Sequence, residues 1–89
     1  MSEQDLAELV QRLLAEGRLP RVRSAILLAG YGRGELCSVC TVPMAATDVV
    51  YELRFAPGDE RSPVIVHYGC FIAWERARLQ MRAAPQAAE

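Results

Sequence analysis

The hydrophobic residues of the first sixteen positions recur at the spacing of one helix face. Polar and charged residues separate the apolar ones, which are Leu6, Leu9, Val10, Leu13 and Leu14. Ser2 can cap the first turn, with Asp5 three residues later, and Gly17 followed by Pro20 ends the pattern. The pattern predicts an amphipathic helix over about residues 3–16. Its apolar stripe needs cover, either from the rest of the chain or from a second copy.

Two segments in the middle of the chain have the patterns of strands. Residues 48–55 alternate between two sets of side chains, and residues 64–66 form a second, shorter apolar run. The polar stretch APGDERSP between them predicts the turn of a β-hairpin. The apolar run AILLA at 25–29 is too short for periodicity to decide between a strand and a helical turn.

Helical periodicity returns from about Gly69 to Arg82. One face of this predicted helix collects apolar residues and one cysteine, namely Cys70, Ala73, Trp74, Ala77 and Met81. We expect Trp74 to belong to the core and the charged side chains to point outward, namely Glu75, Arg76, Arg78 and Arg82. Residues 83–89 have little to bury and are predicted to form a disordered tail.

The three cysteines and the single histidine of the chain fall into two short pairs. Cys37 and Cys40 belong to CSVC, and His67 and Cys70 belong to HYGC. Such pairs can close on one tetrahedral metal ion with little backbone strain, and this donor set favours zinc over iron. The CSVC motif also fits a thioredoxin-like redox site, but a glycine-rich stretch before it and Pro43 after it make that interpretation weaker. The sequence therefore predicts one structural Zn²⁺, with Cys37 in a zinc knuckle whose backbone N–H groups point at its sulfur.

The predicted elements combine into one small α+β domain of 89 residues. A core of this size is only marginally stabilising, so the metal is expected to decide whether the central part folds. We expect an N-terminal helix at 1–17, an Arg/Gly-rich approach segment at 18–36, a zinc-binding module at 37–82 and the tail at 83–89. The module has the treble-clef order of zinc knuckle, β-hairpin and C-terminal helix.

Charge argues against a strongly nucleic-acid-binding domain without excluding weak binding. The net charge is −1, all ten basic residues are arginine, and residues 17–34 carry four of them with no acidic residue. Gly30, Gly32 and Gly34 alternate in this stretch, but they lack the spacing of a phosphate-binding loop and are expected to let the backbone bend into the metal site. The candidate nucleic-acid contacts are Arg18, Arg21, Arg23, Arg33, Arg76, Arg78 and Arg82.

The pattern CSVC…HYGCF…W resembles the zinc finger of poly(ADP-ribose) polymerases over about residues 37–75. The resemblance implies that Cys37, Cys40, His67 and Cys70 are the metal ligands and that Phe71 is the aromatic residue after the last ligand. It also implies DNA ends and breaks as candidate partners, although the strands here are acidic rather than basic. The chain is similar, too, to short uncharacterised bacterial zinc-binding proteins, and that similarity implies no function.

These observations lead to a set of functional expectations. Four good ligands close the metal shell and no histidine remains as a general base, so the chain is expected not to be an enzyme. The leading interpretation is a zinc-stabilised protein-interaction or regulatory module with an unknown protein partner, and the alternative is a zinc finger that binds DNA ends or breaks. A homodimer through the N-terminal helix is a further expectation. The N-terminus has neither a signal peptide nor a membrane span, which with the reduced cysteines predicts a cytoplasmic protein with no membrane partner.

Overall fold

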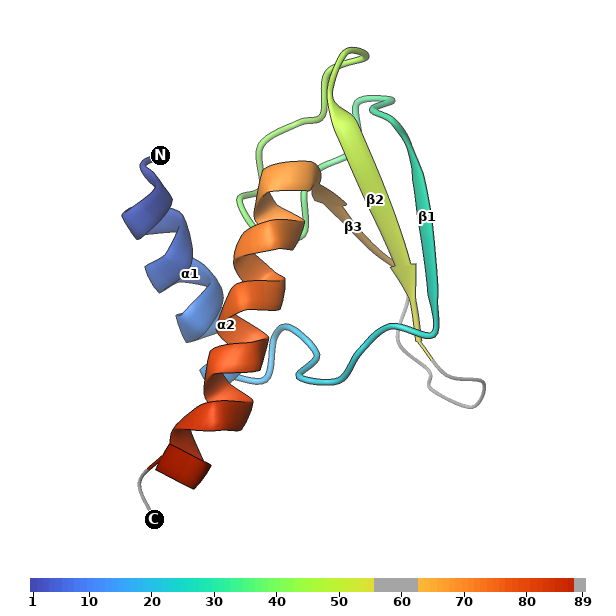
Figure 1. Cartoon of the computed structure of the whole chain (residues 1–89). Helices are drawn as coiled ribbons and strands as arrows, with labels where there is room; N and C mark the ends of the chain where they lie inside the picture. The colour runs from blue at the N-terminus through green and yellow to red at the C-terminus, as the bar shows by residue number, and fades with distance from the viewer. Residues whose placement is uncertain (56–62, 88–89) are drawn as a thin grey trace.

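The computed structural model describes residues 1–55 and 63–87 of the chain (Figure 1). It is an α+β fold with a helix at each end and a three-stranded antiparallel sheet between them. Most of the predicted turn APGDERSP lies outside the described residues. The elements in chain order are α1 (Glu3–Ala15), β1 (Ile26–Tyr31), β2 (Val49–Arg54), β3 (Val64–His67) and α2 (Tyr68–Ala87).

Both ends of α1 carry the capping residues that the sequence predicts. The Ser2 hydroxyl accepts a hydrogen bond from the Asp5 backbone N–H at 3.0 Å, which satisfies one of the free donors of the first turn. At the other end Gly17 has φ +76°, and the Arg18 N–H donates to the Leu13 carbonyl at 2.9 Å. This is the Schellman arrangement, for which glycine is favoured because it adopts positive φ without strain.

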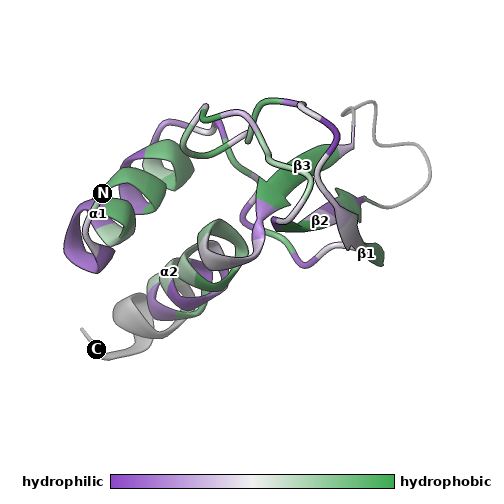
Figure 2. Cartoon of the chain, turned by 90° about the horizontal axis from the view of Figure 1, so that it is seen from above, coloured by the Kyte–Doolittle hydropathy of each residue, from purple (hydrophilic) through white to green (hydrophobic). Residues whose placement is uncertain are grey.

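The apolar stripe of α1 packs against α2, and the two helices lie side by side (Figure 2). Val10, Leu13 and Leu14 are buried, and each stabilises the fold by about 1.5–3 kcal/mol relative to an exposed side chain. The buried indole of Trp74 on α2 adds a hydrogen bond from Nε1 to the Pro20 carbonyl at 3.0 Å. The rest of the chain therefore covers the stripe, which is the first of the two predicted arrangements. Pairing of two copies through α1 stays a prediction.

The sheet has the order β1-β2-β3, with β2 in the centre. The predicted hairpin is the β2–β3 pair, and β1 adds a third strand along the other edge of β2. Residues 26–31 are thus a strand, which settles what the apolar run AILLA left open. Helix α2 packs on one face of β2 and β3, where Tyr51 contacts Phe71 edge-on with ring centroids 4.9 Å apart. The six residues of β1 remain exposed.

Helix α2 differs from its prediction in length and at one arginine. It extends to Ala87, beyond the predicted end near residue 82 and into the segment expected to be a tail, whose residues 88–89 lie outside the description. Cys70, Trp74 and Ala77 are buried as predicted.

Arg78 was expected to point outward and is buried instead, with 5% of its surface exposed. Glu75, one turn earlier, makes this burial tolerable because it accepts hydrogen bonds from Arg78 Nε at 3.1 Å and from Nη2 at 2.9 Å. The prediction failed because side-chain periodicity cannot show that a neighbouring carboxylate neutralises the guanidinium.

In the described part of the chain, neither helix has the length and apolar character needed to cross a membrane.

Candidate metal centre

The CSVC motif folds into a tight turn that points both of its sulfur atoms the same way. The Cys37 N–H donates to the Val42 carbonyl at 3.2 Å, and the Thr41 N–H donates to the Cys37 carbonyl at 3.0 Å. The Val39 N–H points at Cys37 Sγ at 3.4 Å, as expected for a zinc knuckle. Thr41 takes φ +63°, a left-handed conformation that is uncommon for a β-branched residue. The turn requires this conformation, because it reverses the chain directly after the second cysteine.

A backbone hydrogen bond joins the knuckle to the sheet. The Ser38 N–H donates to the Ile65 carbonyl of β3 at 2.9 Å. Strand β3 ends two residues later at His67, and α2 begins at the next residue. The strand end and the first turn of the helix thus carry the second pair of donors to the knuckle.

The four predicted ligands come together as one cluster. The side-chain donor atoms of Cys37, Cys40, His67 and Cys70 all lie within 4.8 Å of one another. Cys40 Sγ and His67 Nδ1 are 3.4 Å apart, and the side chains of Cys37 and Cys70 are buried. Metal–sulfur bonds of about 2.3 Å and metal–nitrogen bonds of about 2.0–2.1 Å require donors at separations of this size. The cluster is positioned to hold one metal ion.

The protonation states of the cysteines in the cluster also fit a bound cation. A hydrogen bond from the Cys70 thiol lowers the pKa of Cys37 to about 4. The same hydrogen bond, together with burial, raises the pKa of Cys70 well above its usual value. Crowded thiols cannot all ionise unless a positive charge lies among them. A divalent cation at the centre would take the place of the shared proton and let all three cysteines bind as thiolates.

Asp48 supports the histidine of the cluster, and sequence reasoning did not identify it as a site residue. Its Oδ2 lies 3.5 Å from His67 Nε2 and accepts a hydrogen bond from the Ala45 N–H at 2.8 Å. A carboxylate on Nε2 holds the proton there and leaves Nδ1, which faces Cys40, free to bind a metal. The signal lies in the strand register, because Val50 on β2 pairs with His67 on β3.

Gly32 positions the segment before the knuckle by close packing rather than by flexibility. A Cβ atom at this position would lie 2.3 Å from the Ala45 carbonyl oxygen and 2.8 Å from Met44 Cβ. The Gly32 N–H donates to the Asp48 carbonyl at 3.1 Å. The expectation that the alternating glycines let the backbone bend fits Gly34, which takes a positive φ of +86°, whereas Gly32 is needed for close packing.

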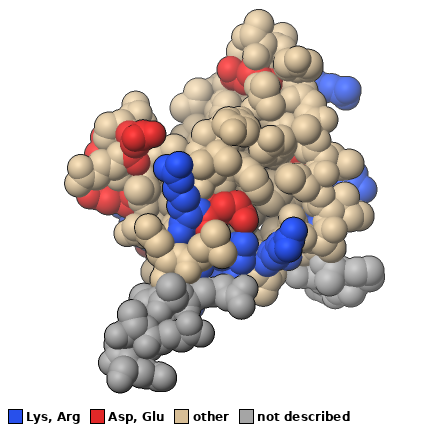
Figure 3. Space-filling view, viewed as in Figure 1, with Lys and Arg blue, Asp and Glu red and all other residues tan. Residues whose placement is uncertain are grey.

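The candidate nucleic-acid contacts converge only in part. Arg21, Arg23 and Arg78 line one hollow of about 520 Å³, but Arg78 is paired with Glu75 and Arg21 Nε donates to the Leu14 carbonyl at 3.1 Å. The face of the molecule drawn in Figure 3 has basic and acidic side chains intermixed and no continuous basic surface.

The remaining candidate arginines are dispersed. Arg18 lies 3.9 Å from Glu16, Arg33 follows the far end of β1, and Arg76 lines the space between the helices. The side chain of Arg82 lies outside the described part of the structure.

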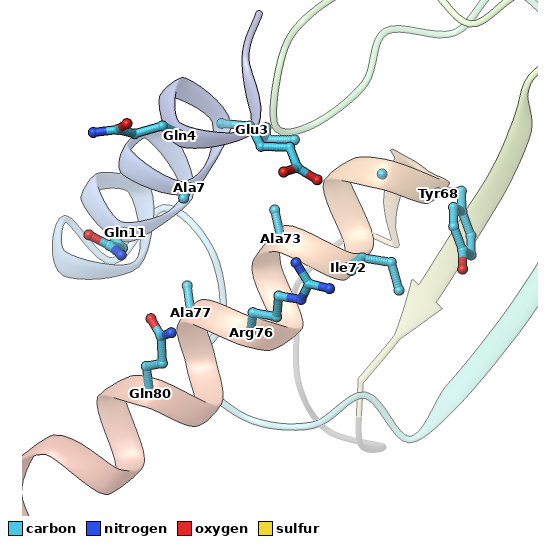
Figure 4. A pocket seen from close by; sticks show the side chains of 12 residues that line it. Glu3, Gln4, Ala7, Gln11, Tyr68, Ile72, Ala73, Arg76, Ala77 and Gln80 are labelled. Carbon is cyan, nitrogen blue, oxygen red and sulfur yellow. The ribbon is translucent and has the colours of Figure 1, made fainter.

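A groove of about 720 Å³ runs between α1 and α2 (Figure 4). Small side chains line its floor, with Ala7 from α1 facing Ala73 and Ala77 from α2. Longer polar and charged side chains surround them, namely Glu3, Gln4, Gln11, Arg76 and Gln80. The two helices thus present a concave surface with an apolar floor and a polar rim.

No protein-family model, curated protein or solved structure matches the chain. The resemblance to the poly(ADP-ribose) polymerase finger therefore stays a prediction that rests on the ligand pattern.

Proposed function

We propose that the cluster binds one structural Zn²⁺ per chain and that this ion holds the knuckle, the sheet and α2 together. The supporting observation is the convergence of three sulfur donors and one imidazole nitrogen within 4.8 Å. This soft donor set suits zinc, because thiolate and imidazole ligands in tetrahedral geometry are its usual structural site. The order of knuckle, β2–β3 hairpin and α2 fits the treble-clef interpretation. The ion would join the knuckle to the end of β3 and to the first turn of α2.

We propose further that the chain is not an enzyme. Four protein donors complete a tetrahedral shell and leave no position for a water or a substrate. The only histidine of the sequence is one of these donors, so it has no free nitrogen for general base work. Asp48 acts on that histidine rather than in a separate pair of carboxylates. The role of the zinc is to stabilise the fold.

Zinc stoichiometry and chelation test the structural role. Purified protein is expected to contain one zinc per chain and to lose its dispersed NMR spectrum when a strong chelator removes the metal. The binding of a structural zinc contributes about 10–16 kcal/mol, compared with total domain stabilities of about 5–15 kcal/mol. Cys70→Ser is expected to give the same unfolded state, whereas Ser38→Ala, an exposed control within the knuckle, keeps both metal and fold. A folded metal-free chain would contradict the proposal.

On this scaffold we propose a protein-interaction module, with the groove between α1 and α2 as its binding surface. The alanines of the floor allow the backbone of a third helix to approach closely, and the polar rim can bind the polar residues that border its apolar stripe. The partner class is therefore an amphipathic helix with a narrow apolar face. The length of the groove along two side-by-side helices favours a helix over an extended peptide.

Capture from the native host with and without nuclease tests this interaction. Ala7→Trp fills the groove, and Leu79→Trp places the same side chain on an exposed position of α2 outside it. We expect a partner protein to resist nuclease, to bind the Leu79→Trp variant normally and to bind the Ala7→Trp variant at least about tenfold more weakly in purified form. Equal binding by both variants would show that the interface lies outside the groove. Capture that is lost after nuclease treatment would favour nucleic-acid binding instead.

The alternative function is binding to nucleic acid, and the hollow lined by Arg21, Arg23 and Arg78 is the observation that favours it. Such a hollow can bind phosphate through several guanidinium groups. Two of the three arginines already make internal hydrogen bonds, and Glu75 adds a negative charge there. The interaction module is therefore the stronger proposal, and titration with labelled oligonucleotides separates the two.

A further inference from the structure

Strand β1 is an edge strand of the sheet, and all six of its residues are exposed. Its sequence ILLAGY contains no charged residue and no proline, which are the residues that usually protect an edge strand from pairing. Ile26, Leu27 and Leu28 are about half exposed, and Tyr31 is 69% exposed. In Figure 1 the strand forms the outer edge of the sheet, away from both helices. Among the described residues, β2 is the only strand that pairs with it.

The backbone of β1 shows which groups the open edge offers. In an antiparallel ladder each residue directs its N–H and C=O to the same neighbour, and the direction alternates along the strand. The register pairs Gly30 with Val50, and beyond it the Gly32 N–H donates to Asp48, so the even-numbered residues face β2. The odd-numbered residues therefore point their N–H and C=O groups to the open side, and they are Leu27, Ala29 and Tyr31.

We propose that β1 pairs with β1 of a second copy of this chain, antiparallel about a two-fold axis at Ala29. In this register Ala29 lies opposite its symmetry mate and Leu27 lies opposite Tyr31 of the other copy. All three residues then exchange backbone hydrogen bonds across the axis. The cross-strand pair of Leu27 with Tyr31 joins an aliphatic and an aromatic side chain, a combination that stabilises sheets. The small side chain of Ala29 avoids crowding at the axis.

The make-up of the strand supports a second copy as the occupant. The exposed side chains of β1 amount to on the order of 500 Å², which is as large as the largest apolar patch of a typical monomer. These side chains point above and below the sheet, so strand pairing covers only their flanks and buries less area than a stable interface needs. A two-fold contact brings the flanks of both patches together, because the same surface contacts itself. A foreign strand would have to be apolar on both of its faces to make the same contacts.

Such an interface predicts a weak dimer with a six-stranded sheet, because interfaces that bury little area are weak or transient. This dimer leaves the groove between α1 and α2 open on each copy, because α2 covers only β2 and β3. The proposal is independent of the partner proposed for that groove, and it places the dimer contact on the sheet rather than on α1.

Sedimentation equilibrium of the zinc-loaded full chain tests the dimer from about 1 µM to about 1 mM, a range that covers weak association. The wild type is expected to shift with concentration from its chain mass of 9.8 kDa toward twice that mass. Ala29→Pro removes one outward N–H without touching the bonds to β2, and Leu27→Lys places a charge on the edge. Both are expected to raise the dissociation constant at least about tenfold, with circular dichroism and zinc content used to verify the fold. Leu79→Lys, at a similarly exposed leucine on α2, is the control and should match the wild type.

Amide hydrogen exchange gives a second readout that tests the register itself. The amides of Leu27, Ala29 and Tyr31 should gain protection as concentration rises, whereas those of Leu28 and Gly30 should be protected at all concentrations.

Three results would overturn the proposal. The first is a wild type that remains a monomer at 1 mM, which would show that β1 does not pair with a second copy. The second is loss of the dimer in Leu9→Asp on α1 together with unchanged dimers in both edge variants. The third is growth into open-ended polymers, which a closed two-fold contact forbids.

Discussion

Replacing Gly32 with alanine should destabilise the domain and weaken its metal affinity, although Gly32 is not a ligand. An alanine Cβ would lie 2.3 Å from the Ala45 carbonyl oxygen, 2.8 Å from Met44 Cβ and 2.9 Å from the Met44 carbonyl carbon. Unstrained heavy atoms do not approach so closely, and the side chain of Met44 is buried. The backbone around residues 44–45 must therefore shift, and it belongs to the turn that holds Asp48 against His67.

The size of the effect follows from the kind of clash. Forcing an extra methyl group into a packed site costs about 1–3 kcal/mol. For a domain of this length, each kcal/mol lowers the melting temperature by about 4–8 °C, so the Gly32→Ala variant should melt roughly 5–20 °C below the wild type. Displacing Asp48 should also weaken zinc binding by about tenfold, the lower end of the effect known for outer-shell partners of a metal-bound histidine.

Two measurements and a matched control decide this prediction. The measurements are thermal unfolding of the zinc-loaded protein and competition for zinc against a chelator of known affinity. Gly30→Ala is the control, since a Cβ at that position meets nothing within 4 Å and its φ is not positive. Alanine there should leave the melting temperature unchanged or raise it slightly, because glycine costs about 0.5–1 kcal/mol in a strand. If the Gly32→Ala and Gly30→Ala variants have the same melting temperature, the close packing at Gly32 does not position the site.

The remaining predictions concern the knuckle, the histidine and the arginines. Thr41→Gly should raise stability by about 1 kcal/mol, because glycine removes the strain of the positive φ, and a lower melting temperature would contradict this. Asp48→Ala should weaken zinc binding by about 10–100-fold, and Asp48→Asn should recover part of the affinity. Equal zinc affinity in the wild type and both variants would show that Asp48 does not support the metal site. Labelled nicked, blunt and single-stranded oligonucleotides, titrated at two ionic strengths, should show no sub-micromolar binding at physiological salt. Tight binding that disappears in the Arg21→Ala/Arg23→Ala double variant would instead favour the DNA-end alternative.

Local sequence features predicted the elements whose structure depends on near neighbours. The periodic leucines and the residues Ser2 and Gly17 located α1, because helix faces and caps are set within a few positions. The short spacing within each donor pair is also local, and the shared donor chemistry of the two pairs predicted that they bind one ion although Cys40 and His67 are 27 residues apart. The buried face of α2, with Trp74 in the core, also followed from periodicity alone.

Features that depend on tertiary register could not be predicted in this way. β1 is a strand because β2 offers it an edge, which the run AILLA does not reveal. Asp48 meets His67 only through the pairing of β2 with β3, and Gly32 is constrained by backbone from residues 44–45. The burial of Arg78 depends on its pairing with Glu75, which a periodic pattern treats as two exposed charges.

X-ray absorption spectroscopy of the metal-loaded protein tests the central claim most directly. We predict a zinc edge and a first shell of three sulfur atoms at about 2.3 Å with one nitrogen at about 2.0–2.1 Å and no oxygen. These are the donors of Cys37, Cys40, Cys70 and His67 in a closed tetrahedron. A shell with an oxygen in place of one of these donors, a second metal per chain or an iron–sulfur spectrum would contradict the account.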